Sequence, residues 1–135
     1  MPTLGQKLLI LAGGSSVLPR YLEVGLVDAY TVVVVFNTAI YASNYATGVV
    51  IKKNTVSQTI DSATLQADNR TVYFVLHVEV AAGDAVTWEY DAGTGDYTNQ
   101  AGNRTMKNVA AKAVVNNLGG MAGYAMGVLG LTYSS

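Results

Sequence analysis

The sequence predicts an all-β protein, built as an antiparallel β-sandwich of about seven strands. Short runs of residues alternate between apolar and polar side chains, and a period of two is the spacing of half-buried strands. Turn-forming residues separate these runs roughly every 8–12 positions, and no long run has the periodicity of a helix. The chain has 135 residues, which is long enough for one domain with a real core.

The composition indicates a protein that covers much of its surface with other molecules. Half of the residues are apolar and only 13% are charged, about half of the ~25% usual in soluble domains. Tyrosine occurs 9 times, and its ring suits contact surfaces because its body is apolar and its tip is polar. We therefore expect a homo-oligomer or a complex with a partner protein.

Charge and residue usage exclude several other classes of protein. The net charge is -1 and the Lys and Arg residues are scattered, so no nucleic-acid partner is expected. Cysteine is absent, which removes disulfides and thiolate metal sites. No apolar run reaches the ~18 residues of a membrane helix, since the longest candidate, 118–131, is interrupted by glycines. No cofactor-binding motif is present either.

The first half of the domain contains the strongest strand prediction. A first strand is expected from Arg20 onward, with Leu22, Val24 and Leu26 on its buried face. The run 31–36 (TVVVVF) follows, and its four consecutive valines favour a strand because branching at Cβ disfavours a helix.

The remaining strands are expected at short intervals. They are placed at 49–52, at one or two positions within 55–65, and at 71–78, 86–90 and 106–116. Residues 41–48 are interpreted as a loop and 67–70 as a turn. Within the strand at 86–90, the side chains of Val86, Trp88 and Tyr90 share one face and are expected in the core.

The sandwich is expected to cover residues 19–117, with an extension on each side. Residues 1–18 form an N-terminal arm with a Gly-Gly-Ser-Ser joint, because the apolar run after Lys7 is too short for a secretion signal. Residues 118–135 form an apolar, glycine-rich tail without a single charge. Such a tail is expected to pack on its own domain or on a neighbouring subunit.

Several short motifs in the right order resemble the SwmB-type bacterial immunoglobulin-like repeats. The resemblance covers about residues 20–117, and it implies that the sandwich is immunoglobulin-like. The matching residues are Phe36-Asn37, Gly83-Asp84-Ala85-Val86 with Tyr90, Ala101-Gly102-Asn103 and Val114-Val115-Asn116.

The resemblance also implies which residues face outward. If Val32, Val34 and Phe36 point into the core, the two strands at 31–36 and 71–78 present an apolar outer face. We expect this face and the tail to bind partners; the alternative is a solvated face of ordinary strand formers. The expected partner-binding residues are Val33, Val35, Tyr73, Val75, Met121, Tyr124, Met126, Leu129, Leu131 and Tyr133.

No residues form a recognisable catalytic constellation, so no enzyme is expected. His77 is the sole histidine and is expected at a strand end or on an outer face. Asp84, Asp91 and Asp96 lie near one polar loop and leave a calcium site open as an alternative, although their spacing lacks a calcium-loop pattern.

The expected function is therefore structural. Repeats of this family occur in tandem arrays on secreted bacterial surface proteins, whereas this chain has one copy with apolar extensions. That difference favours a phage virion protein, either a capsid decoration protein or an accessory protein, which would bind the major capsid protein or neighbouring copies. The alternative is a bacterial cell-surface or secreted module for adhesion or for glycan or protein binding.

Overall fold

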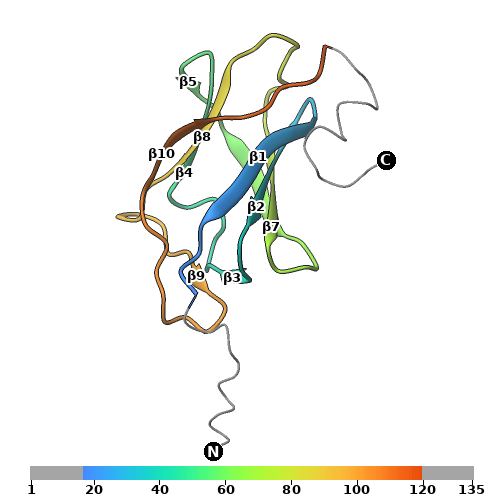
Figure 1. Ribbon diagram of the computed structural model, residues 1–135. Helices are drawn as coiled ribbons and strands as arrows, with labels where there is room; N and C mark the ends of the chain where they lie inside the picture. Colours follow the sequence, from blue (N-terminus) through green and yellow to red (C-terminus); the bar gives the residue numbers. More distant parts are fainter. Residues whose placement is uncertain (1–16, 120–135) are drawn as a thin grey trace, which may run out of the picture.

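A computed structural model describes residues 17–119. In this range the chain is all-β, an immunoglobulin-like antiparallel β-sandwich of two four-stranded sheets with a small two-stranded sheet at one end (Figure 1). One sheet has the order β1-β2-β7-β6 and the other β10-β8-β4-β5, while β3 pairs with β9. The strands are β1 (Tyr21–Asp28), β2 (Thr31–Phe36), β3 (Ile40–Tyr41), β4 (Val49–Lys53), β5 (Val56–Ser57), β6 (Ile60–Leu65), β7 (Thr71–Leu76), β8 (Val86–Tyr90), β9 (Thr98–Asn99) and β10 (Val109–Ala113).

Residues 17–119 contain no helix that is long and apolar enough to cross a membrane.

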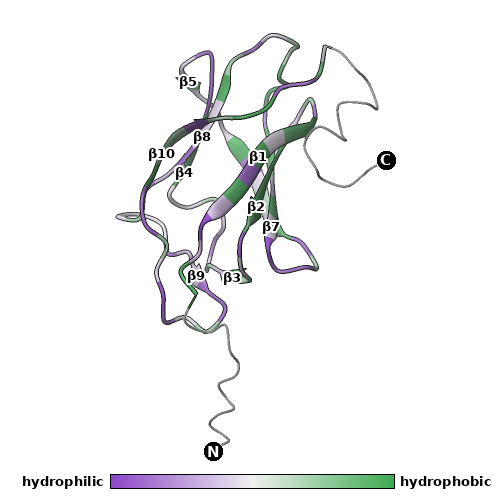
Figure 2. Cartoon of the chain, viewed as in Figure 1, coloured by the Kyte–Doolittle hydropathy of each residue, from purple (hydrophilic) through white to green (hydrophobic). Residues whose placement is uncertain are grey.

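The valine run forms the strand that it predicts, and this strand, β2, is one of the two inner strands of the first sheet. β2 pairs with β1 on one side and β7 on the other. Val32, Val34 and Phe36 are fully buried in the core, which confirms the expected inward face. Figure 2 shows apolar residues along β2 and β7, and hydrophilic residues in the turn between β6 and β7.

The second sheet supplies the largest core side chains. Val86, Trp88 and Tyr90 of β8 are all buried, as predicted. The Trp88 ring lies 5.8 Å from that of Tyr21 and 6.4 Å from that of Phe36 between ring centroids, so it joins the two sheets.

The buried face predicted for the first strand is wrong at one position. Val24 and Leu26 are buried, but Leu22 is 56% exposed and Tyr21 packs against the core instead. A register shift between Tyr21 and Glu23 in the β1–β2 ladder is the cause. Such a bulge interrupts the alternation, so the residues before it face the opposite way from the simple pattern.

The strand count is higher than the sequence predicts because short pairings escape periodicity. β3 and β9 lie outside the predicted strands, yet they pair through Ile40 with Asn99 and Tyr41 with Thr98. The strand predicted at 71–78 ends at Leu76, and the one predicted at 106–116 covers Val109–Ala113.

The loop between β8 and β9 is held on buried tyrosines. Tyr97 is fully buried, and its hydroxyl donates to the backbone carbonyl of Tyr45 at 2.5 Å. Burial raises the pKa of the Tyr97 hydroxyl far above its ordinary range, so the group remains a donor. The polar loop between β8 and β9 is therefore anchored at the end of the sandwich.

The described chain begins and ends at opposite ends of the sandwich (Figure 1). At the start, the Asn37 N–H donates to the carbonyl of Arg20 at 2.9 Å, beside the turn that precedes β7. At the other end, the Asn116 side chain donates to the carbonyl of Ala81 at 3.1 Å, in the segment that follows the end of β7.

Candidate functional site: a groove between two edge strands

A groove lies where the edges of the two sheets face each other. β1 is the edge of one sheet and β10 is the edge of the other. The two edges are joined beyond the end of β10, where the Leu26 N–H donates to the carbonyl of Val115 at 3.0 Å and the Val115 N–H donates to the carbonyl of Val24 at 3.2 Å. Towards the start of β1, no ladder joins the two strands in the part of the chain that the structure describes.

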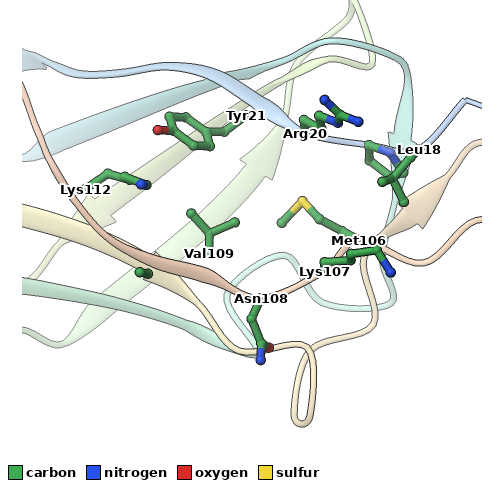
Figure 3. A pocket seen from close by; sticks show the side chains of 10 residues that line it. Leu18, Arg20, Tyr21, Met106, Lys107, Asn108, Val109 and Lys112 are labelled. Carbon is green, nitrogen blue, oxygen red and sulfur yellow. The ribbon is translucent and has the colours of Figure 1, made fainter.

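The open part of this gap is a cavity of about 460 Å³. Figure 3 shows side chains from the start of β1 on one side and from β10 and the segment before it on the other, with the Met106 thioether between them. Its apolar floor comes from Tyr21, Met106 and Val109, of which Met106 is 1% exposed. The complete lining is Leu18, Pro19, Arg20, Tyr21, Met106, Lys107, Asn108, Val109, Ala110 and Lys112.

The charge of the groove is entirely positive. Arg20, Lys107 and Lys112 line it, and the lining contains no Asp or Glu. Their side chains make no hydrogen bond or ion pair with any residue of the range 17–119.

The remaining cations of this range are engaged elsewhere. Lys52 lies 3.9 Å from Glu89, Lys53 donates to a backbone carbonyl, and Arg70 donates to the carbonyl of Asn37 at 3.0 Å. Arg104 also has an interaction. The three cations without a partner are thus those at the groove, which makes it electropositive in a chain of net charge -1.

The predicted outer face of β2 and β7 forms as a continuous strand pair. Val33 lies directly opposite Tyr73, and Val75 lies opposite Thr31. Val33 is only 2% exposed although it lies outside the main core cluster, Val35 and Val75 are half-buried, and Tyr73 is 39% exposed. Tyr73 is therefore the member that offers most of its surface to a partner. Met121, Tyr124, Met126, Leu129, Leu131 and Tyr133 lie outside the described residues.

The other candidate residues stay apart or take structural roles. His77 is exposed, and its Nδ1 lies 3.2 Å from the Asp61 carboxylate. Asp84 accepts from Asn54 at 2.9 Å, whereas Asp91 accepts from the Gly93 N–H and Asp96 from the Ser43 hydroxyl. Asp84 and Asp91 flank β8 at its two ends, so the three carboxylates do not converge, and no group of three metal-ligating side chains occurs within residues 17–119.

Sequence reasoning missed the groove because its two walls are about 85 positions apart in the chain. Lys107 lies just before an alanine-rich strand and Lys112 lies within it, while Arg20 stands alone after a proline. The available signal was that the extended run predicted at 106–116 contains two lysines, and this pattern is common on solvated strands.

No protein-family model and no curated protein sequence matches this chain. Among solved structures, it is similar to the N-terminal part of the bacterial S-layer protein SbsC, with a TM-score of 0.60 at 14% identity over 76% of this chain and 24% of that one. A second structure, of the S-layer protein rSbsC, gives a TM-score of 0.62 at 13% identity over 82% of this chain and 15% of that one. The likeness concerns the fold, and this chain spans less than a quarter of either protein.

Proposed function

We propose that this chain is a non-enzymatic structural module of a bacterial cell-surface or secreted assembly. The observation that carries the proposal is the exit of the chain at opposite ends of an immunoglobulin-like sandwich, through Arg20 at one end and Asn116 at the other. Modules of this geometry can be joined in series or stacked end to end without reversing direction. The fold that this chain shares with part of an S-layer protein supports a structural role at the cell surface.

Contacts with neighbouring copies would come from the outer face of β2 and β7 and from the tail 118–135. Tyr73 supplies an exposed ring beside the half-buried Val75, and the tail carries no charge. Apolar burial with aromatic anchors is the usual source of binding energy at such contacts. We also propose, as part of this function, that the sandwich is related to SwmB-type repeats.

A phage virion protein is the second candidate. The observation that favours it is the uncharged, glycine-rich tail, which would suit permanent burial against a capsid protein. In this case the same two surfaces would bind the major capsid protein or neighbouring decoration proteins.

Immunogold microscopy of the producing cells and of any particles they release separates the candidates. Label on the cell envelope is expected for the first role. Label on released particles would favour the virion role over the cell-surface role. Label confined to the cytoplasm would overturn both candidate roles.

A further inference from the structure

We propose that the groove between β1 and β10 binds an extended acidic segment of a partner protein, which adds as a strand between the two sheets. This inference is independent of the proposed function, because it concerns a different surface from the outer face and the tail.

The first argument is the open backbone on both walls. Each of these strands pairs along one edge with a strand of its own sheet. β1 pairs with β2, with Tyr21 opposite Phe36, and β10 pairs with β8, with Val109 opposite Tyr90. Their other edges face the groove and are joined only at the far end, at Gly25 and Val115. A peptide in an extended conformation can hydrogen-bond to such edges, as in strand addition. On the β1 wall, Arg20 already donates its N–H to the Asn37 side chain and accepts from the Asn37 N–H, and Pro19 has no N–H. Pairing with an added strand on this wall would therefore start at Tyr21.

The second argument is the alternation of chemistry across the groove. The apolar floor of Tyr21, Met106 and Val109 would receive every second side chain of an added strand. The side chains between them would point to the rim, where Arg20 and Lys107 are exposed.

The third argument is charge. Arg20, Lys107 and Lys112 have no ion-pair partner within residues 17–119, and carboxylates on the incoming strand would supply one for each. A nucleic acid would satisfy the charges but would leave the two strand edges without a backbone partner. The combination of cations and open edges therefore favours an acidic peptide.

The binding test uses the full chain and a fluorescein-labelled peptide of roughly eight residues in which valine alternates with glutamate. Anisotropy should rise on titration with the protein, and binding should weaken as salt is added. A peptide with glutamine in place of glutamate should bind at least about fivefold more weakly, since each exposed ion pair contributes up to about that factor. Equal affinity for the two peptides would overturn the charge argument.

Substitutions locate the site. Lys107→Gln and Lys112→Gln should each weaken binding about two- to fivefold, and the double variant more. Lys52→Gln is the control on β4, which β8 separates from β10 in the same sheet, and binding by this variant should stay within about twofold of the parent chain. Equal losses in the control and groove variants would show that the attraction is general and not specific to the groove.

Strand addition has its own readout. The same acidic peptide with alternate backbone nitrogens methylated keeps its charge but loses donors, and it should bind about tenfold or more weakly. Hydrogen exchange should also slow at 21–22 and 107–112 when the unmodified peptide binds. Unchanged exchange there, or equal binding of a single-stranded oligonucleotide of the same charge, would overturn the proposal.

Discussion

The hydroxyl of Tyr90 accepts a hydrogen bond from the backbone N–H of Tyr97 at 3.1 Å, and the two rings lie 5.0 Å apart between centroids. This pair fastens the loop between β8 and β9 to the core. Tyr90→Phe keeps the ring but leaves a buried N–H without an acceptor. We expect a loss of about 1–3 kcal/mol in the free energy of unfolding, measured by urea denaturation.

Tyr41→Phe is the control for this prediction, because Tyr41 is 55% exposed and lies on β3. The Tyr41→Phe variant should lose no more than about 0.5 kcal/mol in the free energy of unfolding. If both variants unfolded at the same urea concentration, the buried hydrogen bond would not be a source of stability.

Two glycines with nearly the same backbone angle should respond differently to alanine. Gly48 has φ +87° and Gly83 has φ +88°. A Cβ on Gly48 would lie 2.7 Å from the Gly95 backbone, whereas a Cβ on Gly83 meets nothing within 4 Å. Gly83→Ala should cost about 1–2 kcal/mol from backbone strain alone. Gly48→Ala should cost about 1–3 kcal/mol more because the backbone must move, and equal thermal shifts for the two variants would rule out this collision.

The turn between β6 and β7 should make stability depend on pH. Burial raises the pKa of Asp68, but hydrogen bonds from the Arg70 N–H and from the Thr71 hydroxyl and N–H outweigh it and hold the pKa below 3.8. The folded chain therefore binds this proton more weakly than the unfolded chain. The carboxylate stabilises the fold above its ordinary pKa, and this contribution is lost as the pH falls through the folded-state pKa.

The measurement is urea unfolding at several values between about pH 6 and pH 2.5. Stability should fall on the acid side, and the Asp68→Asn variant should show a shallower fall than the parent chain. A variant as pH-dependent as the parent would assign the acid sensitivity to other carboxylates, such as Asp84, whose pKa is lowered by hydrogen bonds from the Ala81 N–H and the Asn54 side chain.

The outer face of β2 and β7 should contribute to association. Tyr73→Thr removes the most exposed ring of this face and keeps a good strand former. We expect association between copies to weaken about tenfold, measured by light scattering over a concentration series. Tyr41→Thr removes a similarly exposed ring on another surface and should leave association unchanged. Should Tyr41→Thr weaken association as much, the face would have no special role.

The sequence predicts the centre of this fold well because the central strands consist of β-branched and aromatic residues, which strongly favour strands. The valines of β2 determine the strand, and the alternation of Val86, Trp88 and Tyr90 determines both strand and face. The inward face of β2 is implied by the resemblance to SwmB-type repeats, and all three predictions are confirmed. The edges are harder to predict. Leu22 faces solvent because a bulge changes the alternation, and periodicity carries no information about a bulge.

The groove could not be predicted for a related reason. It exists because β1 and β10 do not pair, and the gap closes only after β10, where Val115 bonds to Val24 and Leu26. This separation depends on how the two sheets twist. Nothing near Arg20 in the sequence indicates that Lys107 and Lys112 lie across a gap from it. The outer face, in contrast, is implied by the resemblance to immunoglobulin-like repeats, which gives the inward residues and makes the two strands neighbours. The near-complete burial of Val33 is not implied by it.

The central claim is that this protein is a structural module that associates with other copies of itself. Sedimentation velocity tests it most directly, by comparing the full chain with a chain that ends at residue 117. The full chain should sediment as species larger than the monomer, while the shortened chain, with an unchanged circular dichroism spectrum, should sediment as a monomer. A full chain that remains monomeric at every concentration, or a shortened chain that associates equally well, would contradict the account.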